Sequence, residues 1–146
     1  MFDFWLMRHC AALLSPTLSK SDLAKARLLD AALATFGNKG LKAATVREIA
    51  RVAGQNVAAI AYHFGGKDPL YRAVLEGIVR EIRSRLRDVL EQVAHFEAQS
   101  EHPKAEALRL LKLFLRAVYL RVLSRDDALP LVRLVVREQL HATSGF

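Results

Sequence analysis

Apolar residues between positions 20 and 66 recur at helical spacing in three separate runs. The first run places four side chains on one face of a helix: Leu29, Ala32, Leu33 and Phe36. Ser21 and Asp22 form a favourable N-terminal cap for this helix. The stretch 37–40 contains two glycines and is predicted to end it.

Two shorter helices are predicted to follow. Thr45 and Glu48 form a capping box, in which the threonine side chain accepts a backbone N–H and the glutamate reaches back to the cap. The inward-facing residues of this second helix are Val46, Ile49, Ala50 and Ala53. Gly54 ends the helix, and Asn56 is the next favourable cap. A third helix therefore starts after a tight turn and ends at the glycine pair 65–66.

A long fourth helix is predicted to begin at Asp68 and Pro69, because proline is tolerated in a first helical turn. Its apolar stripe lasts for about seven turns and comprises Leu70, Val74, Ile78, Ile82, Leu86, Val89, Val93 and Phe96. A loop over 99–104, an apolar fifth helix, a break at 126–130 and a sixth helix over 131–140 complete the pattern. Strand alternation and internal repeats are not found, so the predicted fold class is all-α.

The charge of the chain is concentrated in the region of the short helices. The 146 residues are 52% hydrophobic and 25% charged, which is enough for one or two packed helical domains, and the net charge is +7. Residues 20–72 hold nine Lys or Arg against four Asp or Glu, whereas residues 73–146 hold twelve against ten. A basic excess of this kind indicates an acidic partner such as nucleic acid.

The N-terminal segment 1–19 is expected to be an arm or extension outside the fold, with Met7 as an alternative translation start. It has no basic region of the kind that begins a secretory signal. The lone Cys10 excludes an internal disulfide framework and fits a reducing compartment. The apolar stretch 108–123 is interrupted by four cations, so it is not expected to span a membrane. A cytoplasmic location is the corresponding expectation.

Two short helices joined by a glycine turn and braced by a third helix are typical of a helix-turn-helix. In that motif the second helix enters the DNA major groove, and its first residues meet base edges. Ala58, Ala59 and Ala61 are small enough for a close approach, and Ala58 or Ala59 can contact a thymine methyl group. Tyr62 and His63, at the far end, can donate to phosphates. The sequence therefore predicts DNA binding.

The run TVREIARVAGQNVAAIAYHFGGKDPLY resembles the DNA-binding domain of the TetR/AcrR family of bacterial transcriptional regulators, over residues 22–72. The form N-x-A-A-I-x-Y-H-F-G-G-K is similar to the CecR-like subgroup in particular, as is R-E-Q-L at 137–140. Many family members carry tyrosine at the position of Ala61, whereas this chain has it one residue later, at Tyr62. No operator sequence is therefore carried over from the family.

The resemblance implies a role for each residue of the motif. Thr45 and Lys67 would contact phosphates, Lys67 with help from the dipole of the fourth helix. Arg47 would face the groove, where arginine suits guanine. The base-reading start of the third helix would comprise Gln55, Asn56, Val57, Ala58 and Ala59. Tyr62 and His63 would hold the DNA backbone.

Plainer interpretations exist for three of these side chains. Tyr62 and His63 could cap a core, although Phe64 is expected to supply the buried aromatic there. Arg47 could be a solvated charge paired with Glu48. The exposure and the contacts of each side chain would distinguish these alternatives from a role in DNA binding.

Three regions are expected along the chain: the arm 1–19, a helix-turn-helix domain 20–66, and a partial effector-binding and dimerisation domain 67–146. In the last, the residues that would line a ligand pocket are Leu110, Phe114 and Tyr119, with a plain core role as the alternative. The resemblance implies further C-terminal helices, so the chain is expected to be truncated and to dimerise by an uncertain surface. Catalytic motifs, metal ligands and cofactor signatures are not found, and the chain is not expected to be an enzyme.

Together these features predict an all-α DNA-binding transcriptional regulator, a ligand-responsive repressor of the TetR type. Its partners would be a double-stranded operator, a possible small-molecule effector and a second copy of the chain. The alternative is a truncated helical interaction module that pairs with a full-length regulator. The basic excess of residues 20–72 favours the first interpretation.

Overall fold

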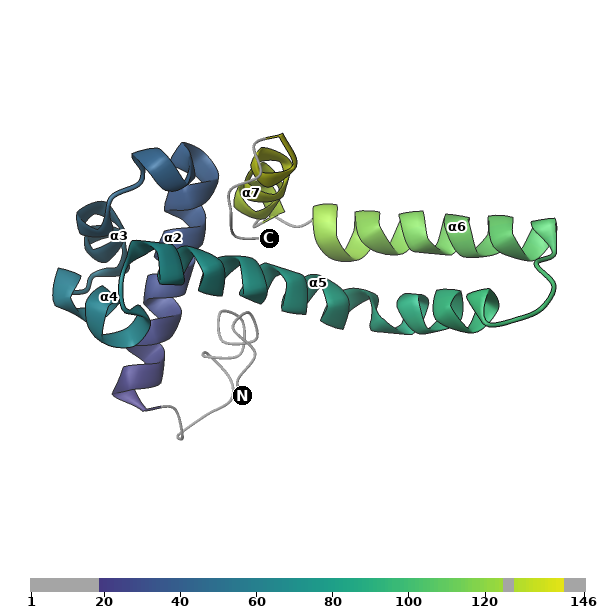
Figure 1. Cartoon of the computed structure of the whole chain (residues 1–146), viewed down its shortest axis with the longest axis horizontal. Coiled ribbons are helices and arrows are strands. Elements are labelled where there is room, and N and C mark those ends of the chain that lie inside the picture. Colours follow the sequence, from purple (N-terminus) through teal and green to yellow (C-terminus); the bar gives the residue numbers. More distant parts are fainter. Residues whose placement is uncertain (1–18, 125–127, 141–146) are drawn as a thin grey trace. The chain divides into compact units, whose positions relative to one another are not determined.

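The computed structural model describes residues 19–124 and 128–140, and every regular element in these ranges is a helix (Figure 1). The elements are α2 (Lys20–Ala43), α3 (Val46–Ala53), α4 (Val57–Phe64), α5 (Lys67–Glu97), α6 (Lys104–Val118), the π-helical η1 (Tyr119–Leu123) and α7 (Ala128–Leu140). The predicted all-α fold class is confirmed. Residues 1–18 of the predicted N-terminal arm, which include Cys10, and the aspartate pair of the predicted break lie outside the described residues.

The described residues divide into two compact units at positions other than the predicted boundary between 66 and 67. The first unit comprises residues 19–78 and 130–140, and the second comprises 79–124 with 128 and 129. The N-terminal part of α5 and most of α7 therefore pack with the helix-turn-helix. Sequence periodicity could not reveal this, because it shows which face of a helix is apolar but not which helix covers that face.

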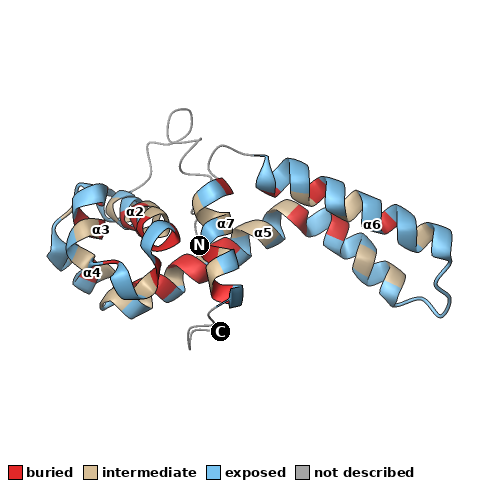
Figure 2. Ribbon diagram, turned by 90° about the horizontal axis from the view of Figure 1, so that it is seen from above, coloured by how far each residue is buried: buried red, intermediate tan, exposed pale blue. Residues whose placement is uncertain are grey.

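The core of the first unit lies where α2, α3, α4 and the start of α5 meet (Figure 2). Its largest fully buried side chains come from all five helices of the unit: Leu28, Phe36, Ile49, Ile60, Leu70, Tyr71, Val74 and Leu134. The rings of Phe36 and Tyr71 meet edge to face, with centroids 4.9 Å apart. Burying a side chain of this size contributes about 1.5–3 kcal/mol, so these residues hold the unit together.

The predicted face of α2 is correct at Ala32 and Phe36, which are buried, and displaced elsewhere. Leu29 and Leu33 are half-buried, and Leu28 is fully buried one residue earlier. The start of the helix also differs from the prediction. The cap is Ser19, whose hydroxyl oxygen accepts from the backbone N–H of Asp22 at 3.1 Å.

The break predicted near the end of α2 is found at Gly40, whereas Gly37 has a function that the prediction missed. The helix continues past Gly37 and Asn38 to Ala43, and only Gly40 departs from helical geometry, at φ 77° and ψ 170°. Position 37 needs a glycine because α7 lies against it: a Cβ there would be 2.6 Å from the carbonyl oxygen of Pro130. This glycine therefore permits close helix packing and does not end the helix.

Both prolines in the later helices lie within a first turn. α5 begins at Lys67, one residue before the predicted cap, and Pro69 follows in its first turn. α7 begins at Ala128, so Pro130 lies inside the helix and not in the predicted break. The first N–H groups of a helix have no intrahelical acceptor, which is why proline fits at both places. The predicted stripe of α5 is confirmed, with each of its eight residues buried or half-buried.

The second unit is a pair of helices, in which α6 runs back beside the later part of α5 (Figures 1 and 2). Its buried side chains include Leu86, Val89, Leu110 and Val122. Arg121 donates to the carbonyl oxygen of Arg85 at 2.9 Å and pairs with Asp88. The outer side of this unit carries exposed apolar residues, namely Leu108, Leu111, Leu115, Tyr119, Leu120 and Leu123. Within the described ranges, no helix has both the length and the apolar character of a membrane span.

Candidate nucleic-acid interface

The start of α3 is built by Thr45. Its backbone is extended, and its hydroxyl oxygen accepts from the N–H of Glu48 at 3.2 Å, as the capping box predicts. The second half of the predicted box is replaced, because the Glu48 carboxylate pairs with Lys39 of α2 at 2.7 Å. Since Oγ1 of Thr45 already accepts this bond, the hydroxyl proton of this exposed residue remains available to a phosphate oxygen.

The turn between α3 and α4 has the predicted chemistry. Gly54 is left-handed, at φ 62° and ψ 36°, and its N–H reaches the carbonyls of the last turn of α3. Asn56 caps α4, with Oδ1 accepting from the N–H of Ala58 at 2.9 Å. The left-handed residue reverses the chain at low cost only if it is glycine. These three residues, 54–56, join the two helices of the motif (Figure 1).

The first half of α4 exposes small side chains, as a helix that enters a DNA groove requires. Ile60 is its one buried residue among the eight of the helix. Val57 is 41% exposed, Ala58 is exposed and Ala59 is half-buried. The predicted base-reading residues thus lie together at the start of α4, with Gln55 and Asn56 in the turn before it. The amide nitrogen of Asn56 keeps its two donors, because the cap uses only the oxygen.

Tyr62 does not cap a core, because 83% of it is exposed. Its ring meets that of the half-buried His63 edge to face, with centroids 4.9 Å apart. The prediction that Phe64 supplies the buried aromatic is wrong. Phe64 is half-buried, with the ammonium of Lys25 5.8 Å from its ring centroid. In the part of the chain that the structure describes, the buried aromatics are Phe36 and Tyr71, and the latter was not singled out by its spacing.

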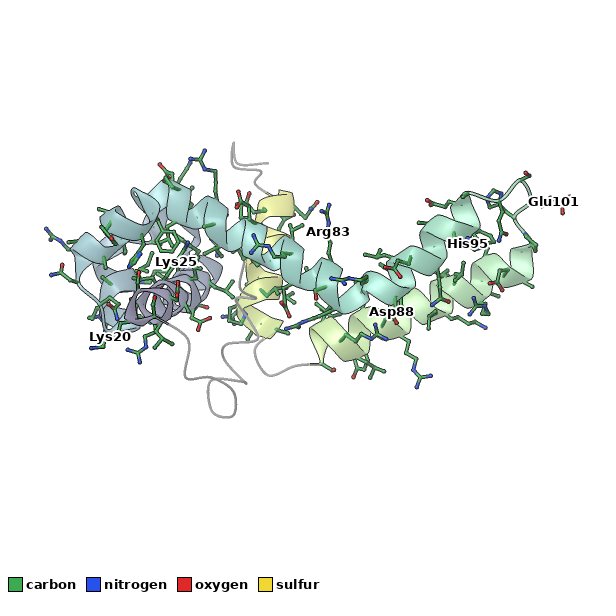
Figure 3. All side chains as sticks on the ribbon, turned by 90° about the horizontal axis from the view of Figure 1, so that it is seen from below. Lys20, Lys25, Arg83, Asp88, His95 and Glu101 are labelled. Carbon is green, nitrogen blue, oxygen red and sulfur yellow. The ribbon has the colours of Figure 1, made fainter. Side chains whose placement is uncertain are left out.

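Arg47 is exposed on α3 and makes no hydrogen bond or ion pair within the described part of the chain. The alternative pairing with Glu48 is therefore not found, since that carboxylate is bound to Lys39. Lys20 and Lys25 lie on α2 in the same unit (Figure 3). The unit that contains α4 thus presents exposed cations, which suit a polyanion.

Lys67 has a setting that its sequence position did not predict. Its side chain is half-buried, and Nζ donates to the carbonyl oxygens of Leu41 at 2.9 Å and Ala44 at 3.2 Å. Both acceptors lie at the end of α2. The only sequence signal for this contact is that the last carbonyls of any helix need donors from elsewhere.

A second candidate site is a cleft in the second unit, with a volume of about 330 Å³. It is lined by Asp88, Glu91, Gln92, His95, Phe96, Gln99, Glu106, Arg109 and Leu110. Of the three predicted pocket residues only Leu110 lies there. Phe114 is half-buried outside this lining, and Tyr119 is 61% exposed.

Two carboxylates of this cleft are held by arginines. Hydrogen bonds from Arg121 lower the pKa of the Asp88 carboxyl, and those from Arg109 lower the pKa of Glu106. Asp88 is exposed and Glu106 is half-buried. The cleft thus combines charged side chains, two of which are paired with arginines, with the apolar Phe96 and Leu110.

Comparison with known proteins explains the geometry of the first unit. Residues 28–74 match the family model described as bacterial regulatory proteins, tetR family. The matched segment is that of the TetR family. The matched segment runs from α2 to the start of α5 and contains every predicted DNA contact. Because this is a family of regulatory proteins, the match also confirms the prediction that the chain is not an enzyme.

Two relatives extend the comparison. The chain is 40% identical over 129 residues to the HTH-type transcriptional dual regulator CecR of Shigella flexneri, covering 87% of this chain and 56% of the relative. It is 32% identical over 93 residues to the HTH-type transcriptional regulator BetI of Brucella canis, covering 64% and 44%. The predicted similarity to the CecR-like subgroup is thus confirmed. The chain spans about half the length of these curated relatives.

Proposed function

We propose that this chain binds double-stranded operator DNA through α3 and α4 and thereby regulates transcription in the bacterial cytoplasm. The observation that carries the proposal is the exposed first half of α4, anchored by the single buried Ile60 and preceded by a properly capped turn. Helices presented in this way enter the major groove in other helix-turn-helix proteins. The match to the TetR family supports the same function.

Each exposed side chain of the motif receives a role from its chemistry. Arg47 and the segment 55–59 read base edges, with arginine suited to guanine and the alanines to thymine methyl groups. Thr45, Tyr62 and His63 donate to phosphates, which position the protein without reading sequence. Lys67 is not included, because its ammonium is bound to two backbone carbonyls.

The regulator is further proposed to be a ligand-responsive repressor that acts as a homodimer. Two reading heads must be held about 34 Å apart to meet successive major grooves, and a second copy supplies the second head. The exposed leucines of α6 and η1 offer apolar surface for that association. A small effector would bind in the second unit, and the cleft beside α6 is the proposed place. Effector binding would favour a state whose spacing no longer matches the operator.

The test compares two duplexes of equal length in a fluorescence anisotropy titration. One duplex is the DNA upstream of the chain's own gene, and the other is a scrambled version. Preferential binding to the upstream duplex at near-physiological salt is the expected result, because non-specific binding weakens steeply with salt. Equal, salt-sensitive binding to both duplexes would contradict sequence-specific recognition.

A pair of variants locates the binding surface in the same assay. Arg47→Ala should reduce the preference for the upstream duplex, at a cost of about 1–3 kcal/mol for one lost base contact. Arg83→Ala is the matched control, since Arg83 is an exposed cation on α5 in the other unit. Equal effects of the two substitutions would argue against base reading by Arg47.

A second function is favoured by one observation, the exposed apolar side of α6 and η1. Such a surface suits a helical interaction module that pairs with a longer regulator. Sedimentation velocity of the chain alone, and mixed with CecR of Shigella flexneri, separates the two proposals. A mixed complex that forms at the expense of self-association, and that no longer binds DNA, would favour the interaction module.

A further inference from the structure

The end of α2 leaves carbonyl groups that no helical N–H can satisfy. The last turn follows the break at Gly40, and the N–H of Ala44 turns back to the carbonyl of Gly40 at 3.2 Å. The carbonyls of Leu41 and Ala44 accept instead from Nζ of Lys67, at 2.9 and 3.2 Å. One side chain from the start of α5 thus completes the end of a helix more than twenty positions earlier in the chain.

The surroundings of this contact are specific. Ala44 is only 1% exposed, so its carbonyl belongs to a region with little access to water. Lys67 follows Gly65 and Gly66, both with positive φ, and these residues end α4 and turn the chain into α5. The lysine therefore joins two places at once, the connection from α2 to α3 and the connection from α4 to α5.

We propose that Lys67 is a positioning residue of the DNA-binding surface and not a phosphate ligand. Ala44 directly precedes Thr45, the cap of α3 and a proposed phosphate donor. Holding the Ala44 carbonyl therefore fixes the direction in which Thr45 and the first turn of α3 are presented. The ion pair of Lys39 with Glu48 is a second tie between α2 and α3. The proposal rests on the proposed DNA-binding function for its effect on affinity, but not for its effect on stability.

A role as a phosphate ligand would require different surroundings for the ammonium group of Lys67. A phosphate ligand should be exposed and without internal partners, as Arg47 is. Lys67 is half-buried and gives two of its three N–H groups to carbonyls within 3.2 Å. To point at a phosphate it would have to leave both acceptors, and the Ala44 carbonyl would lose its partner in a buried place.

The test uses the full chain and three substitutions. Lys67→Met removes the ammonium and keeps the apolar stem, and Lys67→Arg keeps N–H donors that can reach the carbonyls. Lys42→Met is the matched control, because Lys42 is an exposed cation in the last turn of the same helix. Each variant is measured by thermal unfolding. DNA binding is measured over a range of salt concentrations, at a temperature where all variants are folded.

The expected result is a lower melting temperature for Lys67→Met, by about 5 °C, and roughly tenfold weaker DNA binding. The slope of log affinity against log salt should not change, because no phosphate contact is lost. Lys67→Arg should restore most of both properties. Lys42→Met should melt like the unaltered chain. A purely structural role would lower the melting temperature without weakening binding by the folded protein, and would overturn the positioning role.

A phosphate ligand would give the reverse pattern for Lys67→Met: an unchanged melting temperature and a salt slope shallower by about 0.9. That pattern would overturn the proposal. If Lys67→Met does not fold, Lys67→Gln, which retains a donor, takes its place, and failure of both variants to fold would exclude a surface phosphate ligand. If the unaltered chain does not bind DNA, the proposed function fails, while the melting temperatures still test the contact with α2.

Discussion

The two units of the chain differ in how far their side chains are buried. Nine large side chains in the described ranges are less than 2% exposed, and eight of them belong to the first unit. Val89 is the ninth, and it lies in the second unit. The second unit instead carries leucines that are about half exposed along α6 and η1. The first unit therefore has a well-packed core, whereas the helix pair of the second unit leaves much of its apolar surface exposed.

One buried contact of the first unit and two ion pairs of the second unit also differ in their exposure to solvent. In the first unit Tyr71 donates to Glu138 in the interior, where both residues are buried. In the second unit Arg121 pairs with Asp88 and Arg109 with Glu106 on the surface. Exposed pairs contribute little to stability and are screened by salt. The Tyr71–Glu138 contact is therefore shielded from solvent, whereas salt and pH can act directly on the pairs of Asp88 and Glu106.

The largest expected effect comes from truncating a core side chain in each unit. Phe36→Ala removes a fully buried ring from the first unit and should cost about 3–5 kcal/mol. Leu110→Ala in the second unit should cost less, near the lower end of about 2–5 kcal/mol, because the adjoining cleft already exposes part of its surroundings. Urea unfolding followed by circular dichroism gives both values. A larger loss for Leu110→Ala would contradict the comparison.

A smaller effect is expected where α7 packs on α2. Gly37→Ala would place a Cβ 2.6 Å from the Pro130 carbonyl oxygen, and overpacking of this kind costs about 1–3 kcal/mol. Gly54→Ala is the matched substitution, because its Cβ would meet nothing within 4 Å. Its cost should come from the left-handed backbone alone, about 1–2 kcal/mol.

The two glycine variants are separated by where the damage appears. Amide hydrogen exchange should rise along α7 for Gly37→Ala and along α3 and α4 for Gly54→Ala. If α7 keeps its protection in Gly37→Ala, the close packing at Pro130 does not hold that helix in the first unit.

The smallest effect concerns the paired acids of the second unit. Arg121 lowers the pKa of Asp88 below 3.8, and Arg109 lowers the pKa of Glu106 below 4.5. A depressed carboxyl pKa stabilises the folded form above the unfolded value, and this stabilisation is lost as the pH falls through the folded value. Carboxyl carbon NMR titrations should therefore show both groups titrating early, at unusually acid pH, with the shifts reduced in 1 M salt. Ordinary titration of Asp88 in low salt would argue against the pairing.

The sequence predicts best those helix ends that are fixed by contacts between residues close together in the chain. Thr45, Gly54 and Asn56 act through bonds to residues within four positions, so the ends of α3 and α4 were predicted correctly. Gly37 was misinterpreted because its reason is Pro130, on a distant helix. A glycine that ends a helix and one that admits a neighbour look the same in a sequence.

The residues of the candidate sites also differ in whether a local sequence pattern predicts their surroundings. The motif predicted the exposed residues of α4, and the structure shows Val57, Ala58 and Tyr62 exposed. The contact of Lys67 with the end of α2 depends on tertiary folding, and no local pattern encodes it. Helical spacing grouped Phe114 and Tyr119 with Leu110, but only Leu110 reaches the cleft, because spacing does not show which face the neighbouring helix covers.

DNA is proposed to bind the chain at α3 and α4 of the first unit. The most direct test of this proposal is a two-dimensional NMR titration of the isotope-labelled chain with the upstream duplex. We expect amide shifts to be concentrated between residues 45 and 63, strongest at Arg47, at the turn before α4 and at Tyr62, with α6 and η1 little changed. Shifts concentrated along α6 and η1, with α4 unaffected, would contradict the proposal.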